Sequence, residues 1–124
     1  MSQRATCGAG LPTATALLDA ANLPTAIFAF DDPLAIGAMQ ASQARGLRVP
    51  EDLSVVGFDD TAEAELVTPA LTTVRQPPAE MGRMAVRLLM RLLGNQRLEA
   101  VHVELATRLM VRGSTAPPPA ASGP

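Results

Sequence analysis

The sequence predicts an α/β fold in which a short parallel sheet is flanked by helices. Two apolar runs, AIFAF and LSVVGF, each end in an Asp-Asp pair, and each is followed by a segment with the composition of a helix. A third extended run, LTTVRQ, precedes a long amphipathic helix. Strands that alternate with helices favour a parallel sheet with helices on both faces.

The composition is that of one globular domain. The chain has 124 residues, of which 48% are hydrophobic, and its only aromatic residues are three Phe. The core must therefore be built from aliphatic side chains and Met. All ten basic residues are Arg, which excludes P-loop and Schiff-base chemistry that needs Lys. The net charge of −2 does not favour nucleic-acid binding through bulk electrostatics.

Three regions are expected along the chain: a disordered N-terminus over 1–12, a folded region over 13–113, and a flexible Pro/Ala-rich tail over 114–124. The opening MSQRATCGAG has no apolar stretch typical of a signal peptide, and no apolar run approaches the ~20 residues of a membrane span. Cys7 stands alone, without metal-ligand spacing. We expect a cytoplasmic protein that binds no cofactor, metal or membrane.

Apolar runs and turn residues place the individual elements. The expected segments are a helix over 13–21, a buried strand over 25–30, a helix over 33–45, a buried strand over 53–58, a helix over 61–66 and a third strand over 71–76. Two further strand pieces are expected in AVHVEL and RLMVRG. Three of the expected strands alternate with helices, which predicts a partial doubly wound lobe of about three parallel strands.

The longest helix is expected to begin at Pro77-Pro78 and to end near Leu93, before Gly94-Asn95. Its apolar face is formed by Met81, Met84, Ala85, Leu88, Leu89, Leu92 and Leu93. Arg83, Arg87 and Arg91 form the opposite stripe. This stripe is interpreted as a solvated helix face rather than a DNA-binding surface.

The four aspartates divide into two predicted roles. Asp32 precedes Pro33, and Asp60 is followed three residues later by Glu63, so both are expected to be helix N-caps worth about 1 kcal/mol each. Asp31 and Asp59 are not required as caps, and they follow strands whose carboxyl ends border the binding crevice of such sheets. Carboxylates there can accept hydrogen bonds from adjacent hydroxyls of a sugar or polyol, and solvated loop acids remain the alternative.

The segments GLRVPEDLSVVGFDD and PALTTVRQP, within a stretch from about Leu23 to Pro118, resemble the C-terminal part of the LacI/GalR family of transcriptional regulators. The resemblance implies a periplasmic-binding-protein-like effector domain, with two Rossmann-like lobes around a site for a sugar or a nucleobase, and we expect a sugar or a related small molecule as the effector. It also implies a homodimer that controls DNA binding through a separate helix-turn-helix. The fold class is therefore a partial periplasmic-binding-protein-like lobe.

The resemblance also assigns roles to particular residues. Asp59 matches the family's effector-contacting aspartate, and Gln76 matches a polar residue near the effector pocket. Asp31 stands where the family usually has Asn, which is a departure because an ionised Asp can only accept hydrogen bonds. The positions that match the family's dimer contact are Ile36, Met39, Leu66 and Val67, with ordinary core packing as their alternative role.

These 124 residues correspond to about the last third of a family member. The DNA-binding headpiece, the N-terminal lobe and the first half of the C-terminal lobe have no counterpart in them. Two alternatives therefore stay open: a truncated remnant without its own function, and a fragment of a periplasmic-type sugar-binding protein. Enzyme activity is not expected, because His102 is the only histidine and lies near no nucleophile motif.

Overall fold

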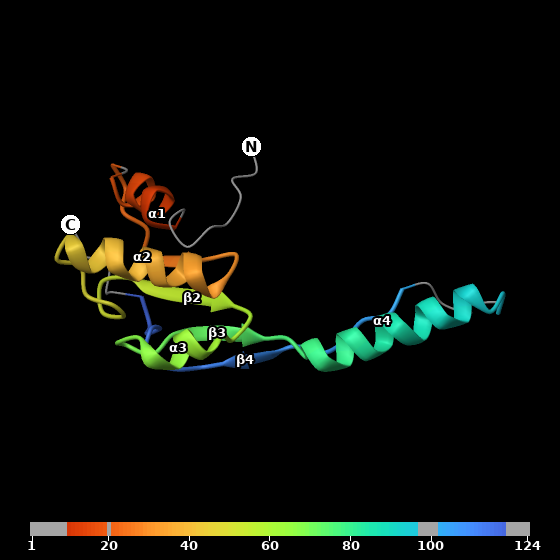
Figure 1. Cartoon of the computed structure of the whole chain (residues 1–124). Coiled ribbons are helices and arrows are strands. Elements are labelled where there is room, and N and C mark those ends of the chain that lie inside the picture. Colours follow the sequence, from red (N-terminus) through yellow and green to blue (C-terminus); the bar gives the residue numbers. More distant parts are fainter. Residues whose placement is uncertain (1–9, 20, 97–101, 119–124) are drawn as a thin grey trace. The chain divides into compact units, whose positions relative to one another are not determined.

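A computed structural model describes residues 10–19, 21–96 and 102–118. The chain divides into two compact units, one formed by 1–75 together with 109–124 and the other by 76–108. The element order is α1 (Gly10–Leu18), β1 (Ala26–Phe28), α2 (Asp32–Ala44), β2 (Ser54–Phe58), α3 (Ala62–Leu66), β3 (Thr72–Arg75), α4 (Pro78–Leu93) and β4 (Arg108–Met110) (Figure 1). The predicted α/β class, a short sheet flanked by helices, is confirmed.

The sheet has the strand order β1-β2-β3-β4. Strand β1 runs parallel to β2, with Phe28 opposite Val56, and β2 runs parallel to β3, with Phe58 opposite Val74. The three predicted parallel strands are therefore present, and β4 falls within the predicted RLMVRG piece. The AVHVEL piece is not a strand over its described residues 102–105, and its first two residues lie outside the described part.

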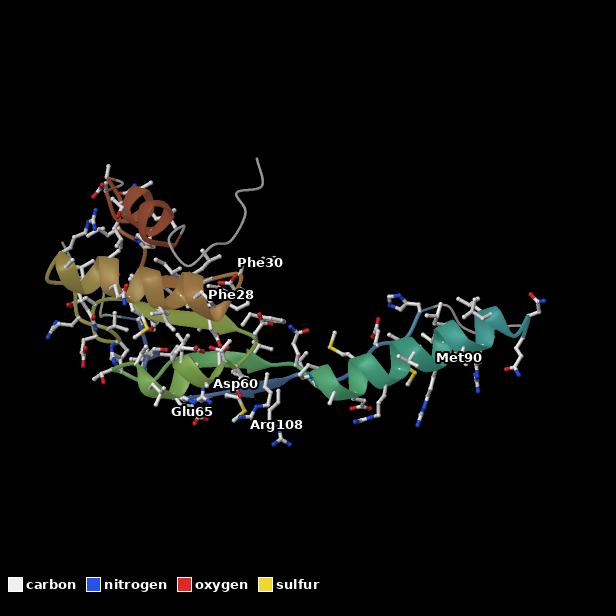
Figure 2. The ribbon with its side chains drawn as sticks, in the orientation of Figure 1. Phe28, Phe30, Asp60, Glu65, Met90 and Arg108 are labelled. Atoms are coloured by element: carbon white, nitrogen blue, oxygen red, sulfur yellow. The ribbon has the colours of Figure 1, made fainter. Side chains whose placement is uncertain are left out.

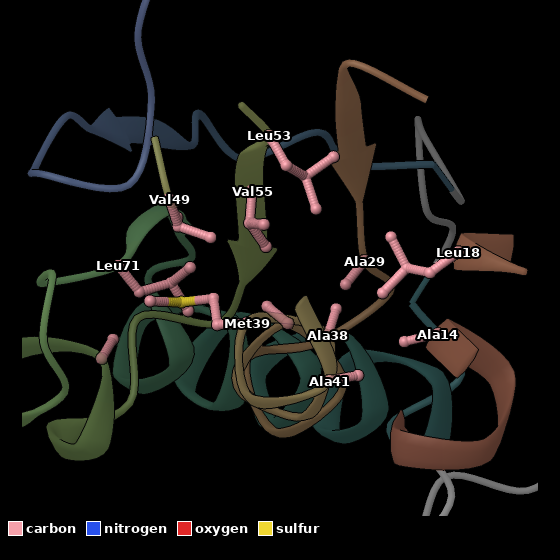
Figure 3. Packing of buried hydrophobic residues seen from close by; sticks show 12 residues of the cluster. Ala14, Leu18, Ala29, Ala38, Met39, Ala41, Val49, Leu53, Val55 and Leu71 are labelled. Carbon is pink, nitrogen blue, oxygen red and sulfur yellow. The ribbon is translucent and has the colours of Figure 1, made fainter. Parts of the chain in front are cut away.

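The core of the larger unit lies between α2, the sheet and α1 (Figure 3). Small Ala side chains let α2 approach the sheet closely, since Ala35, Ala38 and Ala41 are all buried. The larger fully buried apolar residues are Leu53, Val55 and Leu71. An aliphatic core without aromatic side chains is what the composition predicts.

Strand β1 is not buried on both faces, contrary to the prediction. Phe28 is 68% exposed and Phe30 is 86% exposed, while Ala29 between them is buried. Successive side chains of an extended segment point to opposite faces, and α2 covers only the face that carries Ala29. The two exposed phenylalanines border an apolar groove of about 230 Å³ beside β1, and Figure 2 labels them.

The smaller unit contains α4, whose bounds match the predicted helix. None of its residues is buried against the described residues, although it carries large apolar side chains. Leu92 and Leu93 are 56% and 72% exposed. Among the described residues, no helix combines the length and the apolar character needed to cross a membrane.

The predicted flexible tail begins at Ser114, but this residue is fully buried. Its hydroxyl donates to the carbonyl of Val55 at 2.6 Å and accepts from the N–H of Thr72 at 2.8 Å. The backbone N–H of Ala116 donates to the Ser54 hydroxyl at 3.0 Å. The packed part of the chain therefore extends at least to Ala116, with Ser114 bonded to both β2 and β3.

Candidate functional site

The cap of α2 is Asp31, not Asp32. Asp31 has an extended backbone with φ −148°, and its Oδ1 accepts from the N–H of Leu34 at 2.8 Å. The helix begins at Asp32, so Pro33 occupies the second helical position rather than the first. Both aspartates of the pair satisfy the residue preference for a cap, and the burial of Asp32 decides between them.

Asp32 is instead a buried anchor, because no part of it is exposed. Its Oδ1 accepts from the Thr73 hydroxyl at 2.5 Å, and its Oδ2 accepts from the N–H of Thr61 at 2.7 Å. Thr73 lies on β3, and Thr61 directly precedes α3. One carboxyl group at the start of α2 therefore holds the ends of two other elements in place.

Gly57 provides the space for this carboxyl group. A Cβ at Gly57 would lie 2.3 Å from Asp32 Oδ1 and 2.9 Å from Leu71 Cδ2. No real side chain tolerates such separations, so β2 needs glycine here for close approach rather than for backbone freedom.

The turn after β2 is strained. Asp59 has φ +105° and Asp60 has φ +54°, in the region of the φ range that favours glycine. The N–H of Asp59 donates to the carbonyl of Val74 at 2.9 Å, and the N–H of Asp60 contacts the Thr73 hydroxyl at 3.3 Å. Non-glycine residues at positive φ are maintained only where surrounding contacts hold them, and such positions cluster at ligand sites.

Asp60 does not cap α3, contrary to the prediction. The cap position is Thr61, which makes no side-chain capping bond, and the Asp60 carboxyl forms ion pairs with Arg75 and Arg112. The Asp60 side chain is only 4% exposed. Burial alone would raise the pKa of its carboxyl, but the hydrogen bonds from Arg112 and Arg75 outweigh burial and hold that pKa below its usual range.

The structure brings Asp31 and Asp59 to the same edge of the sheet. The last pair of the register joins Phe28 to Val56, and Asp31 and Asp59 each lie three residues beyond that pair along their own segment. Asp31 is half-buried and Asp59 is exposed. Gln76, the third predicted ligand contact, directly follows β3 and is half-buried, but it is the first residue of the smaller unit.

Of the four predicted dimer contacts, Met39 belongs to the core. It is 2% exposed and packs in the buried cluster of the larger unit, so it is not available to a partner. Leu66 is 81% exposed, while Ile36 and Val67 are half-buried. A groove of about 310 Å³ on the same part of the surface is lined by Pro33, Ile36, Gly37, Gln40, Thr61 and Glu63.

Three residues of this region were missed in the sequence. Thr73 and Arg112 bond the aspartates from 41 and 52 residues away, and no local pattern indicates such distant pairs. Phe30 was assigned to the core, although strict alternation along β1 would have placed it with the exposed Phe28. Among the described residues, no group of three His, Cys, Asp or Glu side chains could hold a metal ion.

Comparison with known proteins identifies the family of this chain. The family model of the periplasmic binding protein-like domain matches residues 2–115, which is most of the chain. The chain belongs to the periplasmic-binding-protein-like domain family. It is 48% identical over 108 residues to the HTH-type transcriptional regulator DegA of Bacillus subtilis. Its resemblance to LacI-type regulators is thereby confirmed.

Two solved structures of the family share the fold with this chain. One is the complex of the transcriptional regulator CelR with cellobiose, with a TM-score of 0.81 and 41% identity over 88% of this chain. The other is the lac repressor dimer bound to operator and the anti-inducer ONPF, with a TM-score of 0.81 and 34% identity over 89% of this chain.

The chain spans about a third of the length of the relatives that it matches. The chain covers 87% of its own length in the match to DegA but only 32% of DegA. It covers 33% of CelR and 38% of the lac repressor chain. These relatives are transcriptional regulators, not enzymes.

Proposed function

We propose that this chain is the effector-binding and dimerisation portion of a LacI-type transcriptional regulator, with a sugar as the small-molecule effector. The observation that supports it most is the parallel pairing of β1 with β2, because Asp31 and Asp59 each follow the carboxyl end of one of these adjacent strands. Two acid groups at this edge can accept bonds from adjacent hydroxyl groups. The family membership and the cellobiose complex of CelR agree with this reading.

Asp59 is the principal ligand contact in this proposal. It is exposed and lies in the strained turn after β2. One oxygen of Asp31 caps α2 by accepting from the N–H of Leu34. Asp31 therefore contributes its second oxygen at most, and Gln76 is the third contact. An ionised carboxyl group accepts hydrogen bonds but donates none, so the ligand must present donors to both Asp31 and Asp59.

Isothermal titration of the full chain with cellobiose and a panel of other neutral sugars tests the ligand. We expect heat of binding with at least one sugar, its loss in Asp59→Ala, and its retention in Glu51→Ala. Glu51 is a suitable control because it is an exposed acid in a turn of the same unit. Absence of binding across the panel, or equal loss in both variants, would refute a sugar site at Asp59.

The proposed dimer contact is the surface of Ile36, Leu66 and Val67 beside the groove between α2 and α3. Leu66 is the most exposed of the three, and Ile36 lines the groove. Exposed apolar surface of this kind is typical of protein interfaces. Sedimentation equilibrium should show a dimer for the chain and a monomer for Leu66→Glu. Leu23→Glu is the matched control, since Leu23 is 54% exposed and should leave the dimer intact.

Operator binding in the whole regulator is assigned, in this proposal, to a separate helix-turn-helix headpiece. A regulator of this kind acts on DNA in the cytoplasm, and we propose that location on the basis of the family. The lac repressor structure, a dimer bound to its operator, is the relative that supports this arrangement.

A further inference from the structure

Arg112 bonds three separate parts of the larger unit through one guanidinium group. Its Nη1 donates to the carbonyl of Leu71 at 2.9 Å, and its Nη2 donates to Asp60 Oδ1 at 2.6 Å and to Glu65 Oε1 at 3.0 Å. The side chains of Arg112 and Asp60 are 13% and 4% exposed, so their bond is largely shielded from solvent, whereas the Glu65 side chain is 64% exposed. Figure 2 labels the two acids, Asp60 and Glu65.

Each acid that Arg112 bonds is adjacent to a residue with a proposed function. Asp60 follows Asp59, the proposed ligand contact, in the strained turn after β2. Glu65 precedes Leu66, the proposed dimer contact, at the end of α3. A guanidinium has five donors in a rigid plane, so it can bond both acids at once and transmit a displacement of one to the other.

We propose that Arg112 is a positioning residue that fixes the Asp59 turn and couples it to α3. The functional meaning of this coupling rests on the function proposed above, since it would link effector binding to dimer contact. The coupling itself is a property of the ligand-free chain. Arg75 also bonds Asp60, but its side chain is 47% exposed and has no described bond to α3.

The coupling predicts that loss of the bond to Glu65 loosens the turn at Asp59. Asp59 and Asp60 remain at positive φ only while Asp60 is held, and the Arg112 bond is one of its restraints. Removing the Glu65 end of the bridge gives Arg112 freedom to move. The amide of Asp59, bonded to the Val74 carbonyl, should then open more often, although no residue of the turn has been changed.

Amide hydrogen exchange of the isotope-labelled full chain, measured by NMR without ligand, tests this. We expect Glu65→Gln to speed exchange at Asp59 about two- to five-fold, the range for losing an exposed ion pair. Glu63→Gln is the matched control, because Glu63 lies in the same helix and is not among the described partners of Arg112. The Ala29 amide, bonded to Val56 in the sheet, serves as the reference for global opening.

The Arg112→Lys variant separates coupling from simple stabilisation. A lysine keeps the positive charge but cannot bond Leu71, Asp60 and Glu65 in one plane. In that background Glu65→Gln should have no additional effect on Asp59. Equal effects of the two glutamate variants, a parallel change at Ala29, or a persistent Glu65 effect with lysine would each overturn the proposal. Sugar binding plays no part in this readout, so a failed titration and a failed coupling are distinguishable.

Discussion

Replacing Gly57 by alanine should destabilise the larger unit strongly, since Gly57 faces the buried Asp32. The added Cβ would lie 2.3 Å from Asp32 Oδ1, 2.9 Å from Leu71 Cδ2 and 3.3 Å from the Cβ of Ala35. The first separation requires movement of the carboxyl group, because the neighbouring atoms belong to fully buried side chains. That movement breaks or lengthens the 2.5 Å bond from Thr73.

The magnitude follows from these two effects. Overpacking a filled core costs about 1–3 kcal/mol. Loss of the Thr73 hydrogen bond adds about 1 kcal/mol. The expected loss in the free energy of unfolding is therefore roughly 2–4 kcal/mol, a large share of the ~5–15 kcal/mol typical of a domain. Urea unfolding followed by circular dichroism measures it, and a midpoint equal to that of the wild type would refute the reasoning.

Two further variants show whether the clash with Asp32 is the cause. Gly82→Ala in α4 is the matched control, because nothing lies within 4 Å of a Cβ there, and it should cause no loss of stability. In an Asp32→Ala background the closest obstacle is gone, so Gly57→Ala should cost at least about 1 kcal/mol less than in the wild type. Equal costs in both backgrounds would show that Asp32 is not what excludes the methyl group.

Three other predictions concern the turn and the tail. The pKa of the Asp60 carboxyl is lower in the folded chain than in the unfolded chain, so its stabilising effect is complete above the unfolded pKa of about 4. That effect is lost as the pH falls through the folded pKa. The urea midpoint should therefore decrease in acid less for Asp60→Asn than for the wild type. Asp59→Gly should raise the free energy of unfolding by about 0.5–1 kcal/mol and Asp59→Ala should not, since only glycine relieves φ +105°, as paired denaturation curves would show. Ser114→Ala should lower the free energy of unfolding by about 2–3 kcal/mol in the same assay, because the Val55 carbonyl and the Thr72 N–H both lose a buried partner.

The elements could be predicted because their signals are local. Helix α2 lies within one residue of its predicted bounds at each end, with Pro near its start and Gly46 after it. Helix α4 matches for the same reason. Both strands that precede the aspartate pairs were recognised as apolar runs bounded by turn residues. The misjudged burial of Phe28 and Phe30 reflects a different kind of information, namely which face of β1 another element covers.

The roles of the aspartates could not be derived from their neighbours in sequence. An Asp before Pro satisfies the preference for a cap, and so does the Asp one position earlier. What separates them is Thr73, a residue 41 positions away whose hydroxyl bonds Asp32 in the core. In the same way, Asp60 has capping-box spacing to Glu63, yet two distant arginines bind its carboxyl. The role of a buried charged side chain is therefore decided by partners that are distant in the sequence.

The two Asp-Asp pairs share one arrangement, although the second aspartate of each pair is not the helix cap that the sequence predicts. In each pair the second aspartate is nearly or fully buried and ties its strand end to other elements: Asp32 to Thr61 and Thr73, Asp60 to two arginines. The first aspartate of each pair lies nearer the surface, after the carboxyl ends of the adjacent strands β1 and β2. A carboxyl group at a ligand site is useful only if its backbone does not yield, and a strained turn cannot hold itself. In the ligand site proposed above, the buried partner supplies that restraint, which accounts for the two adjacent acids after both strands.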